Sequence, residues 1–358
     1  MTINQLYHKL LKQIDQLIPN ERVTRKRVLA WLMATLFVGQ SAYASRLSNK
    51  MPGQAKRCSK TARFHRWLKN KSIRVRAWYE PIARQLVDQA AKSGSPIRLI
   101  VDGTRIGAKH QLLMVAIAYR RRALPLAWMW VRKKRGHTSA RKQISLLSYV
   151  HHLIPDQATV VLPGDSEFGA VPVLRQLETW SWDYVLRQKG RYLIQQSPES
   201  EWLRIDTFLS DTGQKLWLMN TALTQKHAHQ SHLLLFWKSG EKDPWFLATN
   251  LTDPSQVLRL YSRRMWIEEM FGDFKKNGFD LESVRLRHFL RLSRFTMAVA
   301  LLYVWVIAFG DKTIKRGQRH LVDRAKQRQL SIFRIGYDML ERCLVNGDSF
   351  HLRMIPYF

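Results

Sequence analysis

Residues 97–131 read IRLIVDGTRIGAKHQLLMVAIAYRRRALPLAWMWV, and this stretch decides the fold. Its first apolar run, Ile97 to Val101, ends in Asp102-Gly103, which predicts a short buried strand running into a turn. Two longer apolar runs follow, Leu112 to Tyr119 and Ala123 to Val131, with three arginines between them. This pattern predicts a hairpin beside the first strand.

Helices and strands alternate after the predicted hairpin. The amphipathic segment Ser139 to Leu153 is typical of a helix, and Thr159 to Leu162 is a further buried strand that ends at Pro163-Gly164-Asp165. A second helix is predicted over Val171 to Leu177, and another strand begins at Tyr184 to Leu186. A hairpin beside strands that alternate with helices predicts an α/β fold, a mixed sheet with helices on its faces.

The net charge restricts the class of partner. The chain has 358 residues, of which 59 are Lys or Arg and 27 are Asp or Glu, so its formal net charge is +32. A hydrophobic content of 46% excludes a disordered basic tail. Such an excess of positive charge attracts polyanions, namely nucleic acid or an anionic membrane surface. The basic residues are spread through the chain and not gathered on one amphipathic helix, which favours nucleic acid and makes a membrane partner the weaker interpretation.

The cysteines and the apolar stretches exclude further classes of protein. Two cysteines, Cys58 and Cys343, exclude a disulfide scaffold and a Cys-based zinc site, and they indicate reduced thiols in a cytosolic protein. Val28 to Ala44 is interrupted by polar residues, and Thr296 to Phe309 is shorter than the ~20 residues of a membrane span. We therefore expect both stretches to form buried helices.

Acidic residues are scarce, so their positions are informative. Asp102 and Asp165 each end a predicted buried strand and each has a glycine neighbour. Ligands of open α/β sheets gather at such strand ends. Cleavage of a phosphodiester commonly uses two divalent ions, which prefer carboxylate ligands. An aspartate in either place is also a common turn residue, so the pair alone decides nothing.

A predicted helix after Asp253 carries a third acid. It is expected to run to Asn277-Gly278, and at ~100° per residue four of its residues share one stripe about 60° wide: Tyr261, Arg264, Glu268 and Lys275. By the same arithmetic Glu269 and Asp273 fall off the stripe. A tyrosine, two cations and a carboxylate on one stripe are not a core pattern. The alternative is an exposed helix face with an ordinary Arg264–Glu268 pair.

The spacing Tyr261-x2-Arg264-x3-Glu268-x6-Lys275 resembles the Y-R-E-K signature of the insertion-sequence-4 family of bacterial transposases. The resemblance covers residues 97 to about 288 and implies an RNase H-like core with a β-rich insertion before the glutamate. It implies that Asp102, Asp165 and Glu268 form a DDE triad holding two Mg²⁺ (or Mn²⁺) ions. Residues 165–168 match the family less closely, and Glu167 there is an additional or rival acid.

The same resemblance implies DNA contacts and a reaction. Tyr261, Arg264 and Lys275 would contact phosphates at the cleaved transposon end. Water would cut the transposon terminus to free a 3′-hydroxyl, which then joins to target DNA. Some relatives pass through a hairpin that needs a base flipped against an aromatic ring, for which the insertion offers four tryptophans: Trp202, Trp217, Trp237 and Trp245. The implied partners are the terminal inverted repeats and target DNA, with two protomers in a homodimer and no membrane, in the bacterial cytoplasm with the nucleoid.

These expectations divide the chain into five parts. They are a helical DNA-binding region (1–95), the first part of the RNase H-like core (96–190), a β-rich insertion (191–250), the second part of the core with the Y-R-E-K helix (251–310), and a helical C-terminal region (311–358). A basic loop at residues 132–135 is a further candidate for contact with the DNA backbone. Two other interpretations stay open: a nuclease or resolvase of the same fold that does not join strands, and a basic DNA-binding protein without catalysis.

Overall fold

The computed structural model describes residues 3–132 and 138–358, so most of the basic loop at 132–135 lies outside the described residues. One mixed sheet of ten strands runs through it, in the order β3-β2-β1-β4-β5-β10-β9-β8-β6-β7. The strands are β1 (Ile97–Ile106), β2 (His110–Tyr119), β3 (Arg122–Arg132), β4 (Val160–Gly164), β5 (Asp183–Arg187), β6 (Leu193–Gln195), β7 (Leu203–Arg204), β8 (Lys215–Leu223), β9 (His229–Phe236) and β10 (Trp245–Thr249).

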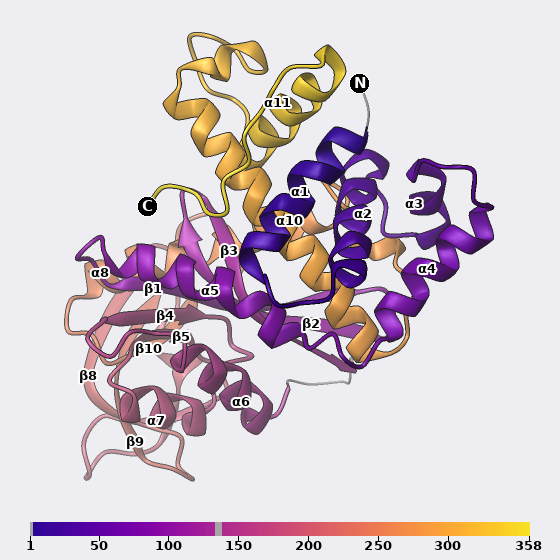
Figure 1. Cartoon of the computed structure of the whole chain (residues 1–358). Coiled ribbons are helices and arrows are strands. Elements are labelled where there is room, and N and C mark those ends of the chain that lie inside the picture. The colour runs from indigo at the N-terminus through magenta and orange to yellow at the C-terminus, as the bar shows by residue number, and fades with distance from the viewer. Residues whose placement is uncertain (1–2, 133–137) are drawn as a thin grey trace.

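Helices cover the sheet and build a second layer beside it. They are α1 (Ile3–Leu17), α2 (Val23–Gly39), α3 (Ala44–Lys50), α4 (Arg57–Lys69), α5 (Val75–Ala91), α6 (Ala140–His151), α7 (Val171–Thr179), α8 (Pro254–Ser262), α9 (Met265–Phe274), α10 (Phe289–Lys315) and α11 (Ile332–Asn346). Figure 1 shows α1 and α2 beside the long helix α10, which also contacts α4 and packs on strand β3 of the sheet. Most buried apolar side chains of both layers belong to one continuous core.

The first five strands form the predicted mixed sheet. β2 pairs antiparallel with both β1 and β3, whereas β1, β4 and β5 are parallel. The α/β class with helices on a mixed sheet is therefore confirmed, and its strand order is the one expected of an RNase H-like core. The predicted hairpin is also confirmed, with Arg120 and Arg121 at its turn.

The prediction that the first strand ends at Asp102 is wrong. β1 continues to Ile106, so Asp102 lies in the middle of the strand. The reason is its pairing with β2, which holds β1 from Leu99 to Ile106 and carries the chain past the parallel neighbour β4.

The prediction of one continuous helix from 254 to 277 is also wrong. The chain breaks at Arg263 and Arg264, where backbone N–H groups bond three residues back instead of four. The two halves face different cores: Tyr261 packs in a small cluster with Val257 and Leu260, whereas α9 packs Ile267, Met270 and Phe271 into the main core. Because the two apolar faces need different directions, the helix bends between them.

The β-rich segment continues the sheet. β10 lies between β5 and β9, and β8, β6 and β7 follow outward from β9. The strands predicted between residues 191 and 250 therefore exist, and they pair edge to edge with the strands of the core. The division of the chain into five parts stays a prediction.

The long helix α10 is the centre of the helical layer. It is long and apolar enough to cross a membrane, but 94% of its most apolar window is buried inside the protein. The bent pair α2 and α3 passes the same test only if taken together. The prediction that residues 296–309 form a buried core helix is confirmed.

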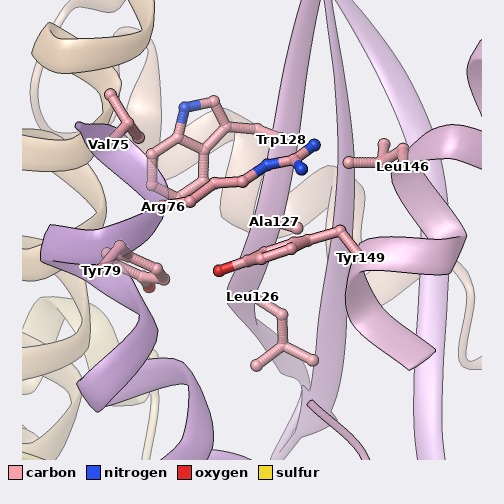
Figure 2. A pocket seen from close by; sticks show the side chains of 8 residues that line it. All are labelled: Val75, Arg76, Tyr79, Leu126, Ala127, Trp128, Leu146 and Tyr149. Carbon is pink, nitrogen blue, oxygen red and sulfur yellow. The ribbon is translucent and has the colours of Figure 1, made fainter. Parts of the chain in front are cut away.

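Helices α5 and α6 meet over strand β3 in an aromatic seam. Figure 2 shows Tyr79 from α5, Trp128 from β3 and Tyr149 from α6 around a small cavity of about 20 Å³. The Tyr79 and Trp128 rings meet edge to face at 4.8 Å, and the Arg76 guanidinium lies 4.3 Å from the Tyr149 ring centre. The space is roughly that of one water molecule, so we interpret it as a packing feature and not as a ligand site.

Candidate active site

Strand register brings the first two predicted acids together. Val101 of β1 is opposite Gly164 of β4, and Gly164 is opposite Leu186 of β5. The next residue on each strand is therefore a polar one, and the three stand in a row across the sheet: Asp102, Asp165 and Arg187. Neighbouring strands lie about 4.8 Å apart, so these side chains share one edge of the parallel part of the sheet.

Two glycines make this row possible. A Cβ at Gly164 would lie 2.7 Å from the Leu186 side chain and 2.8 Å from that of Val101. A Cβ at Gly103 would lie 2.8 Å from Gln111 and 2.9 Å from Leu113. All four distances are shorter than a side-chain carbon tolerates, so a larger residue at either position would force its neighbours to move. Gly103 and Gly164, the glycines beside the two aspartates, therefore have a packing role.

Helix α9 brings the third acid to the same place. A cleft of about 480 Å³ is lined by Asp102, Gly103, Thr104, Asp165, Arg187, Arg264, Glu268, Phe271, Gly272 and Lys275. Five of the six predicted site residues therefore lie in one cleft: Asp102, Asp165, Arg264, Glu268 and Lys275. The Glu268 side chain is 45% exposed, so it is open to solvent and to a ligand.

Arg264 joins two of the three acids. Its Nη1 donates to Asp102 Oδ2 at 2.6 Å, and its Nη2 lies 3.0 Å from Glu268 Oε1. Burial raises the pKa of Asp102 to about 7, although Arg264 and the Gly103 N–H both favour its charged form. Burial opposes the charge of Arg264, but the combined effect of Asp102, Tyr261, Asp165 and Glu268 outweighs it and raises the arginine pKa. The guanidinium is thus the internal counterion of the site.

Tyr261 occupies a different position from the other members of the predicted stripe. Its side chain is buried at 3% exposure, and its ring packs edge to face on Trp245 at 4.9 Å. The Arg264 guanidinium lies 5.6 Å from the same ring centre. Within the described residues its hydroxyl has no hydrogen-bond partner. The buried Tyr261 ring therefore packs near the Arg264 guanidinium. The contact of Tyr261 with DNA stays a prediction.

The carboxylate of the rival acid Glu167 lies next to Gly103 but is held by other residues. Its Oε2 accepts from Gln111 Nε2 at 2.7 Å, and its Oε1 accepts from the Thr138 backbone N–H at 3.1 Å and from the Thr138 hydroxyl. The structure places Asp165, and not Glu167, among the residues that line the cleft. Glu167 instead ties the segment after residue 137 to strand β2.

Glu269 and Asp273, which were predicted to lie outside the helical stripe, do not line the cleft. Glu269 lies 3.1 Å and Asp273 2.8 Å from the guanidinium of Arg122, on the side of α9 away from the cleft. Lys275 ends α9, and its Nζ lies 3.7 Å from Glu282. The cleft therefore receives one helical carboxylate and two cations from this part of the chain.

A second cavity adjoins the cleft and shares Asp165 and Arg187 with it. Its volume is about 820 Å³, and its lining includes Lys189, Arg191 and Trp237. Sequence reasoning missed Arg187, Lys189 and Arg191. The available signal was position: Arg187 directly follows the predicted strand at Tyr184 to Leu186, as Asp165 follows its own strand.

The four tryptophans of the insertion lie in different surroundings. Trp237 lines the cavity beside Asp165, and its indole N–H donates to the Glu241 carbonyl at 3.0 Å. Trp245 packs on Tyr261, and Trp217 lies 5.5 Å from the His232 ring. Trp202 is half-buried outside both cavities.

The chemistry of the three acids fits divalent cations. Mg²⁺ and Mn²⁺ prefer carboxylate oxygens, which is what Asp102, Asp165 and Glu268 offer. As the side chains stand, no three His, Cys, Asp or Glu residues in 3–132 and 138–358 are close enough to hold one ion. In this arrangement Arg264 supplies the positive charge that two of the acids share.

A comparison with protein families identifies the family to which the chain belongs. Residues 93–305, more than half of the chain, match the family described as the transposase DDE domain. Among solved structures, the chain is similar to the cryo-EM structure of a piggyBac transposase synaptic complex with hairpin DNA, at 9% identity and a TM-score of 0.44, over 94% of this chain and 76% of that one. A comparison with curated proteins gives no match. The match over 93–305 shows that the chain belongs to the family of transposases with a DDE domain, enzymes that cleave and transfer DNA.

Proposed function

We propose that this transposase cuts the ends of a mobile DNA element and joins the freed 3′-hydroxyls to target DNA, as a cut-and-paste member of the insertion-sequence-4 family. The observation that carries the proposal is the single cleft in which Asp102, Asp165 and Glu268 meet Arg264 and Lys275. Three acids and two cations in one cleft suit a phosphodiester substrate, because the cations bind phosphate oxygens while the acids hold metal ions.

Each residue then has a defined task. Asp102, Asp165 and Glu268 would hold two divalent ions, Mg²⁺ or Mn²⁺, which when bound activate the attacking oxygen and stabilise the leaving one. Arg264 and Lys275 would bind phosphates beside the cleaved bond and position the DNA strand. Asp102 and Asp165 stand on paired strands, so the distance between their backbones is fixed by the sheet. Such rigid support is what a site for in-line displacement needs.

The adjoining cavity suits the strand that leaves the cleft. It opens from Asp165 and Arg187 toward Lys189 and Arg191, whose charges would follow a phosphate backbone. Of the four tryptophans, Trp237 is the one that lines this cavity, so we propose it as the ring against which a flipped base stacks if the reaction uses a hairpin. Tyr261 would act by holding Arg264 in place.

The remaining parts of the proposal concern partners and place. The helical region 1–95 would bind the terminal inverted repeats, supported by the exposed cations on α4, namely Arg57, Arg63, Arg66 and Lys69. Two protomers would act together in the cytoplasm, since two ends must be cut in coordination.

Glu268→Gln tests the proposed function. We expect it to abolish cleavage of a duplex carrying the inverted repeat that flanks the gene, with Mg²⁺ or Mn²⁺ present, while binding of that duplex is nearly unchanged. Glu341→Gln is the matched control, because Glu341 is also an exposed helical glutamate but lies on α11. Wild-type cleavage by Glu268→Gln would refute the assignment of the acids. Cleavage by the wild type without joining to a plasmid would show a nuclease instead.

A further inference from the structure

A second charged cleft lies on a different face of helix α9 from the one that bears Glu268. Its volume is about 680 Å³, and its lining includes Arg120, Arg121, Arg122, Trp266, Glu269 and Arg328. These residues come from the β2–β3 turn, from α9, and from the segment before α11. We call it the arginine cleft.

Buried acids hold two of its arginines in place. Arg120 Nη1 donates to Asp311 Oδ1 at 2.6 Å, and the Asp311 side chain is fully buried. The other oxygen of Asp311 accepts from the Tyr357 backbone N–H at 2.8 Å. Arg122 Nε donates to the buried Asp273 at 2.8 Å. These anchors fix the hairpin tip against α9 and α10, so the cations at the tip are positioned before any ligand arrives.

The other two arginines have no such partner. Within the described residues neither Arg121 nor Arg328 forms an ion pair with a carboxylate. Burial lowers the pKa of Arg328, and the nearby charges of Arg319, Arg121 and Arg120 lower it further, against the opposing effect of Asp323. Glu269 is the one acid among the residues that line the cleft, and it pairs with Arg122. The cleft therefore keeps an excess of positive charge directed at its open space.

The backbone conformation of the β2–β3 turn is a second indication that its arginines have a function. Arg120 and Arg121 have φ values of 45° and 64°, in the left-handed region. Tight hairpin turns of this kind favour Asn-Gly or Asp-Gly, because other residues pay a steric cost there. Two arginines in these positions are poor turn formers, and residues kept in such conformations often serve a function.

The relation of the two clefts is set by one helix. Glu268 of α9 lines the carboxylate cleft, and the next residue, Glu269, lines the arginine cleft. Successive residues of an α-helix point about 100° apart, so the two clefts open on different faces of α9. We propose that the arginine cleft binds the phosphate backbone of a second stretch of duplex DNA while the first is held at the carboxylates, an inference that rests on the proposed function.

Two stretches of DNA offer that backbone: target DNA, and the part of the donor DNA beyond the cleaved bond. Arg121→Ala, Arg328→Ala and the double variant test for both. Lys226→Ala is the matched control, because it removes one charge from an exposed turn between β8 and β9. Unfolding in urea checks that each variant folds. Arg121→Ala alone keeps the test valid if Arg328→Ala is unstable, since Arg328 also bonds the Leu330 carbonyl.

Three measurements separate the outcomes. If the cleft binds target DNA, end cleavage stays at the wild-type level and the plasmid concentration needed for half-maximal joining rises. If it binds donor DNA, the slope of log affinity for the end duplex against log salt falls by about 0.9 for each arginine removed. If the single and double variants match Lys226→Ala in cleavage, joining and salt slope, the inference is overturned. A wild type that cleaves no ends would refute the proposed function, and the salt slope on any duplex would still test the cleft.

Discussion

Arg264 Nη1 lies 2.6 Å from Asp102 Oδ2, a contact between the first strand of the core and the helix break 162 residues later in the chain. Both side chains are 11% exposed, so the pair is largely withdrawn from water. A buried carboxylate is costly without a partner, and here the partner is a residue that we also assign to phosphate binding. Under the proposed function the same guanidinium would have two uses, as the counterion of Asp102 before DNA binds and as a phosphate ligand afterwards.

Arg264→Ala should lower the free energy of unfolding by about 3 kcal/mol, because it leaves Asp102 buried without a counterion. Urea unfolding of the DNA-free protein measures the loss. The double variant Asp102→Asn/Arg264→Ala should recover much of it, since the amide needs no counterion. Strictly additive effects of the two substitutions would show that the pair contributes nothing.

Lys275→Ala should weaken binding of the transposon end and reduce its salt dependence. One lost phosphate contact lowers the slope of log affinity against log salt by about 0.9. This variant is a cleaner test than one at Arg264, because within residues 3–132 and 138–358 the Lys275 ammonium forms an ion pair only with the partly exposed Glu282, at 3.7 Å. Fluorescence anisotropy at several salt concentrations gives the slope, and a wild-type slope would remove Lys275 from the phosphate-binding set.

Glu167→Gln and Asp165→Asn should differ in kind. Asp165→Asn should abolish end cleavage, because Asp165 lines the carboxylate cleft. Glu167→Gln should keep measurable cleavage and lose about 1 kcal/mol or more of stability, since its carboxylate accepts bonds from Gln111 and Thr138. Cleavage by the Asp165 variant together with loss of cleavage by the Glu167 variant would exchange the two roles.

Asp273 should make the protein less stable as pH rises. Burial raises its pKa to about 7 from 3.8, against the opposing effect of Arg122. The folded state thus binds the proton more tightly than the unfolded state, so its stabilising effect is complete below about pH 4 and is lost by about pH 7. Burial raises the pKa of Asp102 in the same direction. Asp273→Asn should therefore reduce, and not remove, the loss of stability between about pH 4 and about pH 7. An identical pH dependence in urea unfolding would exclude the contribution of Asp273.

Much of the site was predictable from local signals. Apolar runs located β1, β4 and β5, and the polar residue after such a run marked Asp102 and Asp165. The glycines beside them were equally visible, and the structure explains both by contacts that a Cβ would make too short. The helical stripe that it shares with Arg264 and Lys275 then singled out Glu268 among the acids of the helix.

Other features depended on tertiary packing. Residues 262–264 contain no proline or glycine, so nothing local announced the break between α8 and α9. It arises because Tyr261 and Ile267 pack into different cores. The stripe was predicted for one straight helix, on which Tyr261 shares a face with Glu268. Because the helix breaks after Tyr261, this side chain is buried instead. Arg187 was missed because its relation to Asp165 exists only once β4 and β5 pair.

The position of β10 between β5 and β9 sets a limit on how this chain can change. The chain leaves the β-rich segment that contains Trp237 through β10, which pairs with the edge of β5. Deleting residues 191–250 would leave unpaired the N–H and C=O groups of β5 that bond β10, and such a free strand edge promotes aggregation. The segment is therefore not a detachable module. Any shortened form of this protein would have to cover the free edge of β5, the strand next to β4 and Asp165, with another segment.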